Sequence, residues 1–473
     1  MSTKYIAKID PSLNLEEQLR LFAFNGSPLP SNNSIDQIKA TLSKRDILSI
    51  LLQGDLNFHG ESSSYASHDL HAFAAKFPPQ LPRSFIRGLT GPGDIVLDPM
   101  MGSGTTLVEA HLEGRQGIGF DIDPLSLRLG IVKTSTLDPN LLREKSFEII
   151  SKANSFLIND TEITHHLELR FDEKTKSFVD YWFFPDTQRE LMAIILSIEE
   201  IYDPLIRFFF ELTFSSIIIT KSGGVSRARD LAHSRPHLDK TKIPKNAIQQ
   251  FIARIKKNLN SIAQIKSKGY RSNAVFGDAR CMPIKNGSVD LIVTSPPYAN
   301  AIDYMRAHKF SLVWLGGTVS YLAQLRSSYI GSERQSSILD SNLPERPEKI
   351  INKLSEKDHS KSKILKKYFI EMKYVIREMY RVLRDNSPAI IIVGPSIMRD
   401  IDVQTHYCLA DIAFHLGFDV IGVVKRALDR NKRMMPARFG KKSDSMIEQR
   451  MHEEYVIGLL KPDSKKGEFG AYT

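Results

Sequence analysis

The chain has 473 residues, enough for one large domain or two to three ordinary ones, and 42% of them are hydrophobic, which is enough to fill a core. Its 64 Lys and Arg against 54 Asp and Glu give a formal charge of +10, which suits a polyanionic partner such as nucleic acid but also an ordinary basic enzyme. Two cysteines and a charged N-terminal stretch without an apolar leader argue against a disulfide-built secreted protein, so we expect a cytoplasmic one.

The pattern of predicted strands and helices divides the chain into four parts. Residues 1–67 are an N-terminal segment, 68–134 alternate strand-like and helical stretches, 135–270 are mainly helical, and 271–473 alternate again. Within the last part, residues 332–367 are rich in Ser, Lys and Glu, which predicts a mobile surface insertion. We expect an α/β fold with one parallel, Rossmann-like sheet, interrupted by a long helical insertion that is a candidate for target recognition.

The second part opens with a nucleotide-binding pattern. Asp94–Met100 predicts a short buried strand, Thr105–Leu112 a helix and Gln116–Pro124 the next strand. Gly102 and Gly104, before the helix, let the backbone turn sharply and approach a ligand closely. A strand, a glycine loop, a helix and a second strand within about 30 residues open a doubly wound sheet.

The glycine loop differs from two common nucleotide-binding motifs. It lacks the lysine of GxxxxGK and does not read GxGxxG, so ATP hydrolysis and plain dinucleotide binding are disfavoured. Asp121 can accept hydrogen bonds from both ribose hydroxyls, whereas Asp123 can do this or cap the helix that starts at Pro124. Asp278 can hold an adenine amino group or belong to a simple Gly-Asp turn.

The third part contains the most apolar segment, Leu205–Thr220. Arg207 and Glu211 interrupt this segment and it is too short for a membrane span, so we predict a buried helix and no membrane association. In the basic turn that follows, Arg227 and Arg229 are candidate contacts to DNA phosphates, although a solvated polar loop is an equally good interpretation. The histidines lack convincing metal-ligand spacing, so we predict no metal site.

A second constellation follows an apolar strand of the fourth part and consists of Ser295, Pro296, Pro297 and Tyr298. Ligands bind at the carboxyl edge of a parallel sheet, and two consecutive prolines fix the backbone there. Ser295 and a proline carbonyl can accept the two N–H bonds of an exocyclic base amine and restrain its nitrogen toward tetrahedral geometry. Tyr298 can stack on the base, although a plain proline turn explains the tetrapeptide when it is taken alone.

Three residues just after this constellation, Asp303, Tyr304 and Arg306, are candidates for reading the base edge. Farther along, Tyr374–Leu383 predicts an amphipathic helix and Ala389–Gly394 a buried strand. These elements indicate that the sheet continues after the helical insertion.

The two motifs together make the chain similar to the exocyclic-amino DNA methyltransferase family. The cofactor loop of that family typically reads D-P-F-x-G-S-G-T, and its catalytic motif is Ser, Asp or Asn followed by Pro-Pro and an aromatic residue; this chain has DPMMGSGTT and SPPY. The resemblance implies S-adenosylmethionine as the cofactor, with Asp121 at its ribose, Asp278 near its adenine and residues 76–86 over its methionine end. The cofactor residues that it implies are Phe77, Pro78, Asp98, Pro99, Met100, Gly102, Gly104, Thr105, Thr106, Asp121, Asp278 and Ala279.

The same resemblance bears on the base that is methylated. A serine at the first position, here Ser295, is typical of members that methylate N4 of cytosine, whereas aspartate is more typical of adenine-N6 members. Methylation of cytosine C5 needs a cysteine nucleophile, and neither Cys281 nor Cys408 has the expected Pro-Cys setting. The cofactor motif precedes the catalytic one, which is the reverse of the order in many serine-type members.

We therefore predict a site-specific cytosine-N4 DNA methyltransferase of a restriction-modification or other defence system. Adenine-N6 methylation of DNA and amino methylation of RNA or tRNA are the alternatives. The expected partners are double-stranded DNA, with the target base extruded from the helix, and a cognate restriction nuclease.

Overall fold

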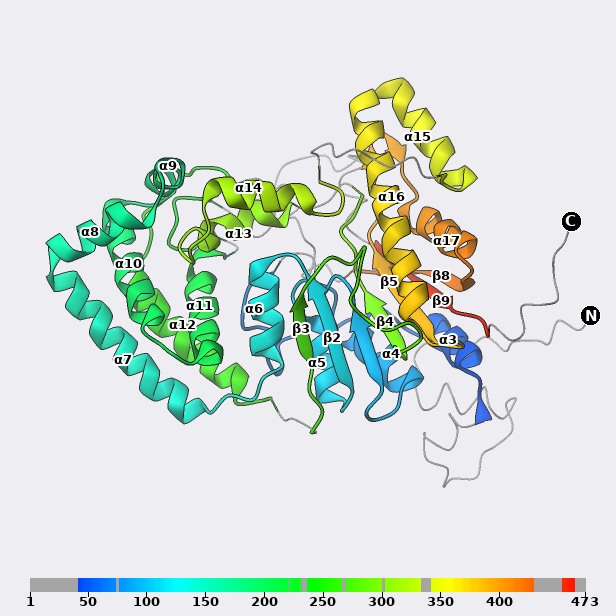
Figure 1. Cartoon of the computed structure of the whole chain (residues 1–473), viewed down its shortest axis with the longest axis horizontal. Coiled ribbons are helices and arrows are strands. Elements are labelled where there is room, and N and C mark those ends of the chain that lie inside the picture. Colours follow the sequence, from blue (N-terminus) through cyan, green and yellow to red (C-terminus); the bar gives the residue numbers. More distant parts are fainter. Residues whose placement is uncertain are drawn as a thin grey trace, which may run out of the picture.

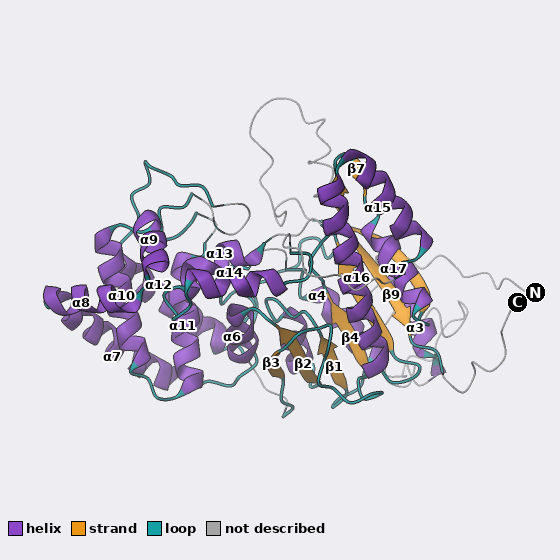
Figure 2. Ribbon diagram, turned by 45° about the horizontal axis from the view of Figure 1, so that its top comes forward, coloured by secondary structure: helices purple, strands orange, loops and turns teal. Residues whose placement is uncertain are grey.

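The computed structural model describes residues 41–73, 76–220, 222–229, 231, 236–265, 269–299, 303–332, 342–428 and 453–463. Within these residues, a central sheet carries helices on both faces, and a block of helices stands beside one edge of the sheet (Figure 1, Figure 2). The first described helix, α3 (Lys44–Gln53), packs on the last two strands at the opposite edge. The start and the end of the described chain therefore meet.

Among the described residues, seven strands form the sheet in the order β3-β2-β1-β4-β5-β9-β8. Neighbours from β3 to β5 are parallel, whereas β9 is antiparallel to both β5 and β8. The predicted α/β class and parallel sheet are thus confirmed. The strands are β1 (Ile95–Asp98), β2 (Gln116–Asp121), β3 (Asn273–Phe276), β4 (Leu291–Thr294), β5 (Pro388–Val393), β8 (Asp419–Ala427) and β9 (Glu453–Leu460), and β6 (Ile397–Met398) pairs with β7 (Ile401–Asp402) in a separate ribbon.

Among the described residues, helices make the long connections between β2 and β3 and between β4 and β5. One run of helices separates β2 from β3, and a second run separates β4 from β5. The helices after α3 are α4 (Gln80–Leu89), α5 (Thr105–Leu112), α6 (Pro124–Lys133), α7 (Pro139–Ile158), α8 (Asp160–Arg170), α9 (Glu173–Trp182), α10 (Pro185–Glu199), α11 (Pro204–Ile218), α12 (Ala247–Ile262), α13 (Tyr304–Leu312), α14 (Val319–Ser328), α15 (Glu345–Lys357), α16 (His359–Val382) and α17 (Thr405–His415).

The alternation of side chains along β5 shows how the sheet is covered. Ala389, Ile391 and Val393 pack in a hydrophobic core with α16 and α17, whereas Ile390 and Ile392 pack in another core with α3 and α4. Successive side chains of a strand point to opposite faces, so a wholly apolar strand needs helices on both sides. The unbroken apolar run of β5 follows from this double burial.

The helical block between β2 and β3 is centred on α11, which agrees with the buried helix predicted over Leu205–Thr220. Its N-cap, Asp203, accepts hydrogen bonds from the first backbone amides, and Pro204 occupies the first turn. Helix α11 contacts α10, α12, α6 and α13, which explains its apolar composition. Among the described helices, none is long and apolar enough to cross a membrane.

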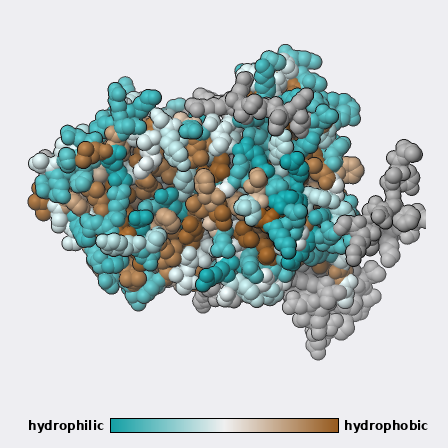
Figure 3. Space-filling view, viewed as in Figure 1, coloured by the Kyte–Doolittle hydropathy of each residue, from teal (hydrophilic) through white to brown (hydrophobic). Residues whose placement is uncertain are grey.

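The prediction of a mobile insertion over residues 332–367 is wrong from residue 345 onward. These residues form α15 and the start of α16, and Ile350, Ile351, Leu354 and Leu365 are buried. Hydrophilic side chains cover the outer surface of both helices (Figure 3), so the average composition conceals an amphipathic pattern. Residues 333–341 lie outside the described part of the chain.

Candidate active site

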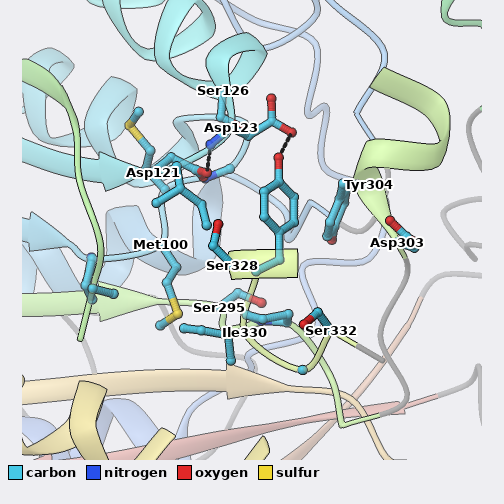
Figure 4. A pocket seen from close by; sticks show the side chains of 18 of the residues that line it. Met100, Asp121, Asp123, Ser126, Ser295, Asp303, Tyr304, Ser328, Ile330 and Ser332 are labelled. Carbon is cyan, nitrogen blue, oxygen red and sulfur yellow. Dashed lines mark hydrogen bonds between the residues drawn. The ribbon is translucent and has the colours of Figure 1, made fainter. Parts of the chain in front are cut away.

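A cavity of about 460 Å³ opens at the carboxyl ends of β1, β2 and β4. Its place agrees with the rule that ligands bind where neighbouring strands of a doubly wound sheet connect in opposite directions. In Figure 4, Asp121 and Asp123 lie toward one end of the cavity, and Met100 and Ser295 lie toward the other. The predicted residues that line the cavity are Phe77, Asp98, Pro99, Met100, Gly102, Thr105, Asp121, Asp278, Ala279, Ser295, Pro297, Asp303, Tyr304 and Arg306.

The glycine loop turns tightly between β1 and α5. Gly102 has φ +46° and Gly104, the N-cap of α5, has φ +74°, values that L side chains rarely adopt. A Cβ atom on Gly102 would lie 3.3 Å from the Phe73 ring, so this position is also short of space. Both glycines thus serve the close backbone turn that the sequence predicts.

Asp98 connects the two motifs. Its buried carboxylate accepts a hydrogen bond of 2.7 Å from the hydroxyl of Thr294, the residue directly before Ser295, and one of 3.2 Å from the amide of Met100. Burial raises the pKa of Asp98 to about 6. The end of β1 and the start of the catalytic loop are therefore held together by a side chain that faces the cavity.

Asp121 has the geometry of a hydroxyl acceptor. One carboxylate oxygen accepts the amide hydrogen of Gly102 at 2.9 Å and the other accepts that of Asp123 at 2.8 Å. Each carboxylate oxygen has two lone pairs, so both retain an acceptor site for a ligand in the cavity. Burial and the neighbouring Asp123 raise the pKa of Asp121 to about 7. These acceptors fit the ribose of S-adenosylmethionine.

Asp123 caps α6, since it accepts the amide hydrogen of Leu125 at 2.8 Å, and it also lines the cavity. Its other oxygen contacts the His308 ring nitrogen at 2.6 Å and accepts the Tyr329 hydroxyl hydrogen at 2.9 Å. Burial alone would raise the pKa of Asp123, but His308 and the hydrogen bonds hold it below its usual value. Asp123 thus joins β2 to α13 and to the wall that contains Tyr329.

Asp278 lines the cavity but is not an isolated acceptor. The Arg280 side chain donates to both of its carboxylate oxygens, at 2.6 to 3.0 Å, and also contacts Glu371 at 2.8 Å. An amino group at Asp278 would have to use a lone pair that Arg280 leaves open. The adenine contact of Asp278 stays a prediction.

The loop of residues 295–298, which we call the catalytic loop, lies partly at the cavity and partly in the protein interior. Ser295 and Pro297 line the cavity, whereas Pro296 and Tyr298 are not among its lining residues. The Tyr298 hydroxyl donates to Glu454 at 3.0 Å, and a Cβ atom on Gly394 would lie 2.5 Å from the Tyr298 ring. The expected exposure of Tyr298 to a base in the cavity is therefore not observed, because these two neighbours hold the ring elsewhere.

A different pair of aromatic rings borders the cavity. Phe73 and Tyr304 stack with their ring centroids 5.2 Å apart and their planes at 26°, and both line the cavity. Asp303, beside them, contacts Arg306 at 2.9 Å and Arg326 at 2.5 Å. One wall of the cavity therefore combines aromatic surface with two arginines.

Five other predicted residues lie away from the cavity lining. The Thr106 hydroxyl donates to the carbonyl of Val293 at 3.1 Å and ties α5 to β4, and the Pro78 carbonyl accepts from Leu81 at the start of α4. Arg227 stacks over Phe184, with 4.7 Å from its guanidinium carbon to the ring centroid. The five residues are Pro78, Gly104, Thr106, Arg227 and Arg229.

Sequence reasoning missed one part of the cavity lining. This part comes from the end of α14 and the segment after it, from α16 and from β6, none of which carries a motif for the site. Phe73 and Lys76 could have been suspected because they border the predicted cofactor segment 76–86. The missed lining residues include Phe73, Lys76, Ser328, Tyr329, Ile330, Gly331, Ser332, Lys361, Ile364 and Met398.

Comparisons with known proteins found a family model and several relatives. The family model described as DNA methylase matches residues 34–131. The type II methyltransferase M.MvaI of Kocuria varians is 22% identical over 76% of this chain and 83% of its own length, and M.AvaI of Nostoc sp. is 24% identical over 69% and 73%. A Thermus thermophilus protein of known structure, described as a putative DNA modification methylase, has 17% identity and a TM-score of 0.21, and the match covers 40% of this chain and 51% of that protein.

The Rossmann-like sheet, with its glycine loop and the buried Asp121 carboxylate facing one cavity, has the fold of an S-adenosylmethionine-dependent methyltransferase. Ser295 and Pro297 line the same cavity, and the two relatives named above are type II methyltransferases. The chain is similar to the exocyclic-amino DNA methyltransferases of the N6/N4 type, whose family model matches residues 34–131.

Proposed function

We propose that the protein methylates N4 of cytosine in double-stranded DNA at a specific sequence. The observation that carries this proposal is Ser295, which follows β4 directly and lines the cavity beside Pro297. In the family that the motifs resemble, serine at this position is typical of cytosine-N4 members. The proposal covers the methylated base, the double-stranded DNA substrate and the sequence specificity.

The catalytic role that we propose for the loop follows from the chemistry of the amine. The lone pair of an exocyclic amine is delocalised into the ring, so the nitrogen must be held toward tetrahedral geometry and aligned for attack. Bound S-adenosylmethionine supplies an electrophilic methyl group. The Ser295 hydroxyl and a proline carbonyl of the loop accept the two N–H bonds, and a proline offers its carbonyl without a competing amide donor.

We propose that the target base leaves the duplex to reach this site. The cavity lies at the sheet edge, and a base paired within a helix cannot present its amino group to residues lining a cavity. Tyr298, the stacking partner expected from the sequence, is held outside the cavity lining by Glu454 and Gly394. Phe73 and Tyr304 border the cavity, so these two rings are the stacking partners that we propose for the base.

The DNA backbone has candidate contacts close to the cavity. Arg306 and Arg326 both contact Asp303 and both line the cavity, so we propose that this pair meets a phosphate of the bound DNA. Arg227 and Arg229 on the helical block are proposed contacts farther away. The type II designation of the relatives supports a restriction-modification role with a cognate nuclease.

Product analysis tests the proposal directly. The protein is incubated with methyl-labelled S-adenosylmethionine and either unmethylated duplex DNA or total RNA, and the digested nucleosides are separated. Labelled N4-methyldeoxycytidine is the expected product, and Ser295→Ala should reduce its rate of formation. Labelled N6-methyldeoxyadenosine would overturn the cytosine assignment, and label in RNA alone would overturn the substrate.

A further inference from the structure

A buried ion pair lies where the last two strands meet the catalytic loop. Arg426 near the end of β8 and Glu454 near the start of β9 form an ion pair with 2% and 8% of their surfaces exposed. Burying two charges removes hydration that their mutual attraction often fails to restore, so a hydrophobic pair would serve stability as well. The role of this ion pair must therefore be sought in the other groups that Arg426 and Glu454 contact.

The pair joins three separate segments. The Arg426 side chain also donates to the carbonyl of Leu56 at 2.9 Å, in the segment after α3. Glu454 uses one carboxylate oxygen for Arg426 and accepts the Tyr298 hydroxyl hydrogen on the other, at 3.0 Å. A continuous polar chain thus runs from residue 56 to the last residue of the catalytic motif.

The strand directions explain why this contact is possible. Because β9 is antiparallel to β5, its first residues lie at the carboxyl edge of the parallel strands, where Tyr455 pairs with Val393. Gly394 follows at once, and a Cβ atom there would lie 2.5 Å from the Tyr298 ring. The ring is therefore held by Gly394 on one side, and its hydroxyl is held by Glu454.

We propose that Glu454, itself oriented by Arg426, is a positioning residue for methyl transfer. By holding the Tyr298 hydroxyl, it fixes the end of a loop in which two rigid prolines connect Tyr298 to Ser295, so the positions of Ser295 and of the proline carbonyls depend on this contact. This inference rests on the proposed role of the loop as amine acceptor, but it does not depend on which base carries the amine. A displacement of about 1 Å at reacting groups can lower a rate a hundredfold.

A double-mutant cycle tests the proposal in the full-length protein. Single-turnover methyl transfer is measured at saturating cofactor and DNA for wild type, Glu454→Gln, Tyr298→Phe and the double variant. Each single variant should be slowed about tenfold or more, and the double variant should be no slower than the slower single one. Cofactor dissociation constants should stay within about twofold of wild type, because Glu454 does not line the cavity.

Glu453→Gln is the matched control. Glu453 is the preceding residue of β9, pairs with Lys425 and accepts from the Tyr455 hydroxyl, so the same substitution removes a charge from the other face of the strand. It should transfer methyl groups at the wild-type rate. A loss equal to that of Glu454→Gln would show a general effect of hairpin stability and overturn the proposal.

Two further outcomes would overturn it. One is a wild-type rate for folded Glu454→Gln, and the other is an equal slowing by this change with and without the Tyr298 hydroxyl. If Glu454→Gln does not fold, Glu454→Asp replaces it in the cycle, since the shorter side chain keeps a charge beside Arg426 and draws back from Tyr298. Identifying the methylated base in the same samples tests the proposed function separately, because coupling between the two residues is measurable on any product.

Discussion

Asp121 should make cofactor binding dependent on pH in the neutral range. Burial and Asp123 raise its pKa to about 7 in the free protein, so much of it is protonated near neutral pH. Ribose hydroxyls that donate to the carboxylate, together with the positive sulfonium of the cofactor, favour the ionised form. Binding must then displace a proton, and the affinity should fall as the pH falls below 7.

The size of the pH dependence of cofactor affinity follows from the raised pKa of Asp121. At pH 6 the free carboxyl is protonated in about a tenfold excess over its ionised form, so the apparent affinity should be about tenfold lower than at pH 8, or about 1.4 kcal/mol. Asp98, whose pKa is about 6, contributes at most about a further factor of two at pH 6. The two carboxyls act in the same direction, with Asp121 dominant.

Calorimetric titration of the protein with S-adenosylmethionine at pH 6 and pH 8 measures the effect. Asp121→Asn should remove most of the pH dependence and weaken binding about tenfold to a hundredfold at pH 8, since its amide leaves Gly102 or Asp123 with an unmatched N–H. Asp278→Asn is the control, because it removes another cavity carboxylate and leaves Asp121 in place. Equal wild-type affinities at the two pH values, or a full tenfold dependence in Asp121→Asn, would refute the reasoning.

Three further predictions concern the loop, the glycine turn and DNA. Ser295→Ala should slow single-turnover methyl transfer about tenfold to a hundredfold while cofactor affinity by calorimetry changes less than about twofold. Gly102→Ala should lower the melting temperature and weaken cofactor binding, because φ is +46° and the new methyl group meets Phe73 at 3.3 Å. Arg326→Gln should weaken DNA binding and reduce the slope of log affinity against log salt by about one, measured by fluorescence anisotropy, whereas an unchanged slope would exclude a phosphate contact.

Elements with marked ends were predictable from local sequence. Helix α5 begins at Thr105 and ends at Leu112 as predicted, because Gly104 supplies the left-handed residue before its first turn. Strands β1 and β4 are short apolar runs, and the polar and proline-containing turns that follow them end each strand. The cofactor half of the cavity followed from these elements, since the strand ends determine where the side chains meet.

Partners far apart in the sequence could not be predicted in this way. Glu454 lies 156 positions after Tyr298, and no local pattern of either residue indicates the other. Arg280 stands two residues after Asp278 and its pairing could have been suspected, but Glu371, its second partner, is 91 positions away. These contacts depend on strand order and helix packing, which are properties of the whole fold.

The order of the two motifs, which seemed a departure from many serine-type enzymes, has little structural consequence. Strands β1 and β4 are neighbours and parallel, so the loops after Asp98 and Thr294 reach the same edge whichever strand comes first in the chain. The helical block enters between β2 and β3, at the edge of the sheet, where added helices do not disturb the β1 and β4 pair. The order of the motifs therefore reflects only which of the two strands comes first in the sequence. The identity of the methylated base must be inferred from the side chains that line the cavity, beginning with Ser295.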